Sequence, residues 1–202
     1  TQAAEFTSLI DKKTKTEFAW QGNPDVWAGR NPTLFPVVGK VWQEKYRFNG
    51  QEFSLGNHGF ARKSEFSLAA QTPTSLTLVL ENSPATQAVY PFKFRLTNHY
   101  QLEKNTLKVT LTVENLDQVE LPFSLGAHPA FNCPLLSGEK FTDYKIVFSQ
   151  RENLTRLLMS SDSSFQEKRL NFGQQVQEIP LTRELFAQDA LVFENLESSS
   201  VK

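Results

Sequence analysis

Two short stretches of this sequence place a histidine beside small residues, and both have the composition needed for acid–base chemistry. The first, residues 55–62, contains His58 directly before a glycine, and the second, residues 124–134, contains His128 directly before a proline. An imidazole titrates near neutral pH, so it can both give and take a proton during a reaction. By residue type alone, a core histidine at the end of a strand is an equally good interpretation of His128.

The residues around His128 favour a functional role. Gly126 and Ala127 are predicted to leave room for a ligand beside the backbone, because neither carries a large side chain. Pro129 biases His128 toward extended geometry, which helps to fix the direction of its side chain. We therefore expect a histidine held in one orientation at an open position.

The three histidines are predicted to differ in role. His58 follows a turn, and loops are where functional groups are brought to the surface of a sheet. His99 lies on the polar side of an alternating segment and is interpreted as a solvated surface residue. The spacing between His58 and His128 does not by itself indicate that they meet.

Composition excludes some classes of function. The 21 basic and 22 acidic residues leave a net charge of −1, which gives no electrostatic reason to expect nucleic acid or an anionic membrane as a partner. No apolar run approaches the ~20 residues of a membrane span. The single cysteine, Cys133, excludes an internal disulfide and fits a reducing compartment. We expect a soluble, cytoplasmic protein in which Cys133 is a packed thiol.

Alternating apolar and polar residues predict the elements that position these histidines. Period-two patterns cover residues 75–80, 92–102, 107–114 and 144–148, as in an antiparallel sandwich with one buried and one wet face. Asn-Gly at 49–50 predicts a tight hairpin. The fold class is therefore all-β, an antiparallel β-sandwich with a few short helical turns, and residues 1–202 are interpreted as one domain.

Smaller elements are predicted between these strands. We expect a hairpin over residues 9–20, one helical turn at 23–27, and an irregular segment at 34–39 because its two prolines disfavour a central strand. Residues 181–187 are predicted to form a short helix with Thr182 as its N-cap.

The two histidine motifs together resemble the aldose 1-epimerase (galactose mutarotase-like) family, in its LacX-like branch. They are HGFAR at 58–62 and GAHPAFN at 126–132, and flanking segments at 5–27, 32–40, 90–94 and 181–193 look like the same branch. The resemblance covers nearly the whole chain. It implies a galactose mutarotase-like antiparallel β-sandwich (supersandwich), with His58 and His128 meeting on the open concave face of a large sheet.

The resemblance also implies a reaction, the interconversion of the α and β anomers of a small-molecule sugar, an aldohexose or its phosphate. His128 would protonate the ring oxygen, and His58 would orient or polarise the sugar beside it. The base would be a glutamate expected beyond Lys202, since the chain looks truncated at both ends and a third of the full domain is expected there. No cofactor and no metal are expected, because only protons move.

The resemblance also implies sugar-binding roles for three further residues, and each of them has an ordinary structural alternative. Asp189 falls where the family has an acidic residue that binds sugar hydroxyls, or it is an ordinary acidic loop residue. Arg62 would bind a hydroxyl or a phosphate, or pair with Glu65. Phe131 would be an apolar platform for a sugar face, although burial is the commoner fate of such a phenylalanine.

One departure from the family concerns the substrate. Better-known galactose mutarotases have an Asn-Arg-Ile element near the first histidine, and its arginine contacts the sugar. This chain has Thr33-Leu34-Phe35 in the comparable stretch, with Arg30 and Asn31 displaced. The departure puts galactose itself in doubt as the substrate.

Two other classes of function have a β-sandwich and are compared with this sequence by the residues that each needs. A non-catalytic carbohydrate-binding β-sandwich of the same fold would bind sugar without accelerating its conversion. A cupin-like metal enzyme needs a His-x-His pair, which this sequence lacks. The expected loss of C-terminal strands would leave open sheet edges, which favour aggregation or a homodimer.

Overall fold

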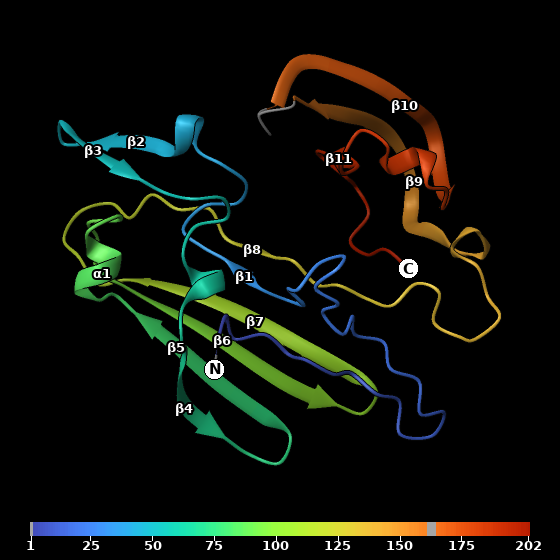
Figure 1. The fold of residues 1–202 in the computed structure, drawn as a ribbon, viewed down its shortest axis with the longest axis horizontal. Helices are drawn as coiled ribbons and strands as arrows, with labels where there is room; N and C mark the ends of the chain where they lie inside the picture. Colours follow the sequence, from blue (N-terminus) through green and yellow to red (C-terminus); the bar gives the residue numbers. More distant parts are fainter. Residues whose placement is uncertain (1, 161–164) are drawn as a thin grey trace. The chain divides into compact units, whose positions relative to one another are not determined.

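The computed structural model describes residues 2–160 and 165–202, and its regular structure is mostly strand (Figure 1). The strands are β1 (Thr33–Leu34), β2 (Lys45–Phe48), β3 (Gln51–Ser54), β4 (Ser67–Gln71), β5 (Ser75–Glu81), β6 (Phe94–Glu103), β7 (Thr106–Asn115), β8 (Gly126–Ala127), β9 (Lys145–Met159), β10 (Phe165–Pro180) and β11 (Val192–Phe193). The helical turns are η1 (Trp42–Glu44), η2 (Ala61–Lys63), α1 (Pro84–Gln87), η3 (Phe141–Asp143) and η4 (Glu184–Phe186). The predicted all-β class with short helical turns is therefore confirmed.

The chain forms two compact units, of which unit 1 ends at Phe131 and unit 2 begins at Asn132. The single sandwich domain over residues 1–202 stays a prediction. Within the described residues, no helix is both long enough and apolar enough to cross a membrane.

Unit 1 is built on a four-stranded antiparallel sheet in the order β4-β5-β6-β7 (Figure 1). Leu80 of β5 pairs with Leu96 of β6, which pairs with Val113 of β7. Apolar side chains therefore line up across neighbouring strands on one face, as the alternation predicts. The predicted strands over residues 75–80, 92–102 and 107–114 correspond to β5, β6 and β7.

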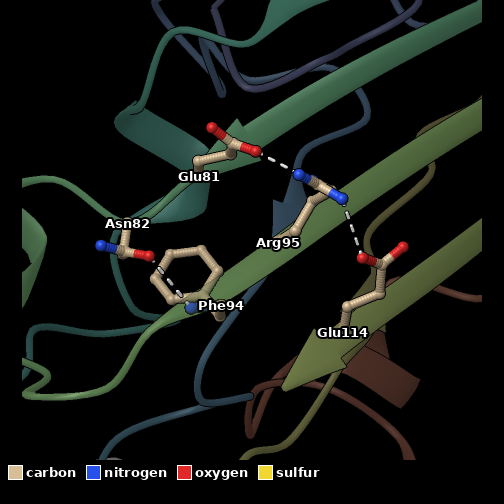
Figure 2. Close-up of polar contacts among 5 residues, drawn as sticks. All are labelled: Glu81, Asn82, Phe94, Arg95 and Glu114. Atoms are coloured by element: carbon tan, nitrogen blue, oxygen red, sulfur yellow. Dashed lines mark hydrogen bonds and ion pairs between the residues drawn. The ribbon is translucent and has the colours of Figure 1, made fainter. Parts of the chain in front are cut away.

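The two faces of this sheet are distinguished by adjacent residues of β6. Phe94 is fully buried, whereas the next residue, Arg95, points to the polar face. Figure 2 shows Arg95 between two carboxylates, with Nε 2.8 Å from Glu81 and Nη1 3.1 Å from Glu114. Asn82 accepts a hydrogen bond from the Phe94 N–H at 3.2 Å at the strand's start. These ion pairs are about half exposed, so they contribute little stability.

The core of unit 1 is an aromatic cluster centred on Phe35. This side chain is fully buried. Its ring centroid lies 5.9, 5.8 and 4.9 Å from the ring centroids of Phe60, Tyr90 and Phe94. Burial raises the pKa of Tyr90, whose hydroxyl donates to the Pro122 carbonyl at 2.9 Å. The segment that holds the core together is therefore the same irregular, proline-containing stretch predicted at residues 34–39.

The predicted turns of unit 1 are found where the sequence places them. Strands β2 and β3 form a hairpin, with φ of 48° at Asn49 and 78° at Gly50, as a type I′ turn requires. Residues 23–27 form one turn in which Asn23 accepts the Trp27 N–H at 2.7 Å. The predicted hairpin over residues 9–20 is reduced to a single bridge between Ile10 and Glu17.

Unit 2 is a three-stranded antiparallel sheet in the order β10-β9-β11, over a small core of Phe148, Leu154 and Ile179. The strand predicted at residues 144–148 is the start of β9. The helix predicted at 181–187 is only the three-residue η4, and Arg183, not Thr182, holds its N-cap position without a side-chain cap. Thr182 is therefore wrong as the cap, because the helix begins one residue later than its side chain requires.

Candidate active site

The turn that carries His58 is fixed by close contact with Phe35. His58 and Gly59 have φ of 61° and 67°, both in the left-handed region. A Cβ at residue 59 would lie 2.3 Å from the Phe35 carbonyl oxygen, which accepts the N–H groups of Phe60 and Ala61. Only glycine fits this approach, so the His-Gly pair seen in the sequence has a steric cause.

The ring of His58 is oriented by Gly39. The Gly39 N–H donates to Nδ1 of His58 at 2.9 Å, and the His58 N–H donates to the Gly39 carbonyl oxygen at 2.7 Å. An Nδ1 that accepts a backbone hydrogen bond must carry a lone pair, which assigns the proton of the neutral ring to Nε2. His58 is therefore held as a hydrogen-bond donor through Nε2.

The surroundings of His58 favour this neutral form. Burial lowers the pKa of His58, and the electrostatic influence of Arg62 and His128 lowers it further. Desolvation and like charge both disfavour a second proton on the imidazole. At neutral pH His58 is thus a neutral donor and not a cation.

His128 directly follows the short pairing of β1 with β8. Thr33 pairs with Ala127, and the His128 N–H donates to the Pro32 carbonyl oxygen at 3.2 Å. The His128 side chain is exposed. Within residues 2–160 and 165–202 no hydrogen bond fixes its ring nitrogens, which leaves them available to a ligand.

The space beside Gly126 is used differently from the prediction. A Cβ on Gly126 would lie 2.9 Å from Cγ2 of Val38, so this glycine accommodates Val38 rather than a ligand. Ala127 is exposed, in agreement with an open position next to His128. Of the two small residues, Gly126 therefore makes room for Val38, and Ala127 leaves space open to solvent next to His128.

The structure brings the two histidines together. The rings of His58 and His128 lie 6.0 Å apart between centroids, at an interplanar angle of 73°. Both residues belong to unit 1. Their roles in binding or catalysis stay predictions, but the spacing lets one small ligand contact both rings.

Trp27 lies beside His128, a neighbour that the sequence did not predict. Its ring lies 4.9 Å from that of His128, tilted by 46°. Trp20 Nε1 donates to the Trp27 carbonyl oxygen at 2.9 Å, and a Cβ on Gly29 would lie 2.6 Å from Cζ2 of the indole. The helical turn predicted at residues 23–27 was the available signal, because it ends on this tryptophan.

Arg62 and Phe131 also belong to unit 1. Arg62 lies in η2, is half-buried, and is close enough to influence the charge on His58. Among the described residues it forms no ion pair with Glu65, whose backbone instead bridges to Gln2. Phe131 is 56 % exposed and bridges to Ala19 through its backbone, so its ring is open to solvent.

Three other residues singled out in the sequence are described by their own surroundings. Asp189 belongs to unit 2, has φ of 71°, and its carboxylate accepts the Ala190 N–H at 2.7 Å. Cys133 is exposed, so its prediction as a packed thiol is wrong; the chain there is a surface loop. His99 is half-buried on the polar face of β6, where Nδ1 lies 2.9 Å from the Thr77 hydroxyl.

Two further features bear on ligands. Over the described part of the chain, no group of three or more His, Cys, Asp or Glu side chains gathers closely enough to hold a metal ion.

An apolar cavity of about 330 Å³ in unit 1 is lined by Leu9, Leu76 and Tyr100 among others, and neither site histidine contributes to it. The histidine site is therefore separate from this cavity.

Comparisons with known proteins agree with these features. A model of the aldose 1-epimerase family matches residues 2–187. The chromosomal LacX protein of Lactococcus lactis subsp. lactis is 34% identical, over 100% of this chain and 70% of its own length.

Two solved structures are similar along almost the whole chain. A galactose mutarotase related enzyme from Lactobacillus acidophilus is 34% identical with a TM-score of 0.91, over 96% of this chain and 65% of that one. A galactose mutarotase-like protein from Lactobacillus casei ATCC 334 is 29% identical with a TM-score of 0.90, over 99% and 69%. The chain thus spans about two thirds of the length of these relatives.

Proposed function

Because this chain belongs to the aldose 1-epimerase family and has a galactose mutarotase-like fold, we propose that it acts in interconverting the α and β anomers of an aldose or aldose phosphate. The observation that carries the proposal is the pairing of His58 and His128 at 6.0 Å, with one ring held as a donor and the other exposed. The family supplies the substrate class, and the histidine pair supplies groups suited to its chemistry.

The reaction opens and recloses the sugar ring. A base removes the proton of the anomeric hydroxyl, its electron pair forms the carbonyl at C1, and the bond from C1 to the ring oxygen breaks. An acid protonates the ring oxygen as it leaves. After rotation about the bond between C1 and C2, the same steps run in reverse on the other face, so no proton is gained or lost overall.

We assign the acid to His128. Its ring is exposed and its nitrogens are free of hydrogen bonds within the described residues, so a sugar can reach them. We assign to His58 a fixed donor role, because Gly39 occupies Nδ1 and leaves only Nε2–H to face a ligand. A donor of this kind stabilises charge that develops on the sugar oxygens as the ring opens.

The remaining residues are proposed to bind the sugar. Arg62 beside His58 supplies a cation for a hydroxyl or a phosphate, and the exposed ring of Phe131 supplies an apolar platform. Trp27 offers a second aromatic surface next to His128. Asp189 is retained as a ligand of sugar hydroxyls on the family resemblance alone, and the base is proposed to be a carboxylate.

The proposal is tested by following the anomeric conversion of freshly dissolved α-glucose, α-galactose and glucose 6-phosphate by NMR. The wild-type chain, His128→Ala and His99→Ala are each compared with buffer alone. His99 is the matched control, because it lies on the polar face of β6 and bonds to Thr77. Acceleration by wild type and by the His99 variant that is lost in the His128 variant would support the proposal.

The same samples separate the alternatives. Acceleration would also demonstrate that a base lies within these 202 residues. Sugar-induced shifts of the His58 and His128 ring signals without any acceleration would favour a carbohydrate-binding domain without catalysis. Neither acceleration nor shifts with any of the three sugars would overturn the proposal.

A further inference from the structure

Asn98 is an unusual residue for the buried face of a sheet. It lies in β6 between Leu96 and Tyr100 on the apolar face and is 0% exposed. Burying an amide is unfavourable unless its polar atoms find partners. Its Nδ2 donates to the Thr33 hydroxyl at 2.6 Å, whereas its Oδ1 has no partner within residues 2–160 and 165–202.

The partner of Asn98 leads directly to the candidate active site. Thr33 is itself only 3% exposed and lies in β1, where it pairs with Ala127, the residue before His128. The next residue toward the N-terminus, Pro32, accepts the His128 N–H. The Asn98 amide therefore connects the large sheet of unit 1 to the strand that holds His128.

A second buried amide acts on the other side of His128. Asn31 is 7% exposed; its Oδ1 accepts the Ala130 N–H at 3.3 Å, and its Nδ2 donates to the Phe6 carbonyl at 2.9 Å. The Ala130 N–H also lies 3.1 Å from the Arg30 carbonyl oxygen. Residues 127, 128 and 130 are thus all held by residues 30–33.

These side chains matter because the backbone pairing there is short. Strands β1 and β8 share only two residue pairs, Thr33 with Ala127 and Leu34 with Gly126. So short a ladder specifies its register weakly, and a slip of one residue would turn His128 to the opposite face. Hydrogen bonds from buried side chains can supply the missing specification.

We propose that Asn31, Thr33 and Asn98 form a buried polar strap that positions His128 for the sugar. Among the described residues no hydrogen bond joins any of the three to the histidine ring, so they are positioning residues and not catalytic ones. The inference rests on the proposed function for its consequence, since a displaced His128 would meet the ring oxygen poorly. Misplacement by about 1 Å is enough to lower an enzymatic rate by up to ~100-fold.

The test compares two threonine-to-valine variants that remove one sheet hydroxyl each. Thr33→Val removes the acceptor of the Asn98 amide, and Thr77→Val removes the hydroxyl that contacts His99 on the other face. Aromatic NMR spectra of the full chain report the ring signals of each histidine. We expect Thr33→Val to shift the His128 signals and weaken its ring-to-ring contact with Trp27, and Thr77→Val to move only those of His99.

Two further variants separate positioning from loss of structure. Thr33→Ser keeps the hydroxyl and should restore the His128 signals. Asn98→Leu combined with Thr33→Val removes both polar partners, which is often nearly neutral for stability. This double variant should therefore remain folded while His128 stays displaced, even if the single variant unfolds.

Function supplies the second readout. If wild type accelerates anomer conversion, Thr33→Val should reduce kcat by about 10-fold with KM less affected, and Thr33→Ser should restore it. Unchanged His128 signals in folded Thr33→Val and in the double variant would overturn the strap. If wild type neither binds nor converts sugar, the proposed function fails, and the ring signals still decide whether the strap positions His128.

Discussion

The backbone of Gly39 holds the His58 side chain in one tautomer: the Gly39 N–H donates to Nδ1 at 2.9 Å, and the Gly39 carbonyl accepts the His58 N–H at 2.7 Å. These two hydrogen bonds explain how the half-buried imidazole of His58, although it lies in a turn, presents Nε2–H in a fixed direction. It also makes protonation of His58 incompatible with its native hydrogen bond, because a charged ring has no acceptor nitrogen.

Stability should therefore depend on pH through His58. Its pKa in the folded chain lies below the ordinary value of 6.5, chiefly because of burial. As pH falls below 6.5, the unfolded chain binds the proton first, so the stability contributed by neutral His58 is lost. His58→Asn keeps an acceptor for Gly39 and does not titrate.

Urea unfolding at about pH 7.5 and about pH 5 measures this effect. The wild-type chain should lose more stability on acidification than His58→Asn, since the carboxylates that titrate are common to both. Equal losses in the two proteins would contradict a lowered His58 pKa.

Gly59→Ala should be strongly destabilising. The new Cβ would lie 2.3 Å from the Phe35 carbonyl oxygen at a residue with φ of +67°. Gly50→Ala is the matched control, because Gly50 has φ of +78° but nothing within 4 Å of its Cβ position. We expect a loss of about 3 kcal/mol or more at Gly59 and about 1–2 kcal/mol at Gly50 in urea unfolding. Similar losses would mean that the Phe35 segment can move away.

Trp27→Leu should change the environment of His128 without unfolding the chain. It removes the ring 4.9 Å from the imidazole, a contact of the kind that contributes about 0.5–1.5 kcal/mol. The His128 ring protons should move, and sugar affinity should fall several-fold. Trp42→Leu is the control, because Trp42 is 70% exposed. A variant of Trp27 that left the His128 signals in place would remove Trp27 from the site.

Neighbouring residues of β6 should differ sharply in their effect on stability. Phe94→Ala empties a fully buried position in the aromatic cluster and should cost about 3–5 kcal/mol. Arg95→Gln removes only half-exposed ion pairs with Glu81 and Glu114, shown in Figure 2, and should cost far less. Urea unfolding of both variants is the measurement; comparable losses would contradict the assignment of the two faces.

Much of the local structure could be predicted from residue types alone. The alternation over β5, β6 and β7 specifies which side chains face the core, because successive residues of a strand point to opposite faces. Asn49-Gly50 suits a hairpin turn, and the two histidine motifs in order indicate the family. The alternation also places Asn98 on the buried face of β6, between Leu96 and Tyr100, but it does not indicate which partner its amide finds.

The contacts that build the site depend on the tertiary structure. Gly39 meets His58 across 19 residues, and Asn98 meets Thr33 across 65. Such pairs are brought together by the packing of irregular segments around Phe35 and by the short pairing of β1 with β8, neither of which has a periodic signature. The sequence by itself therefore determined the strands, their buried face and the two histidine motifs. The tertiary structure decided that the two histidine rings lie 6.0 Å apart, that Trp27 lies beside His128, and that Asn31 and Asn98 are buried next to the segment that carries His128. Only long-range packing sets those distances.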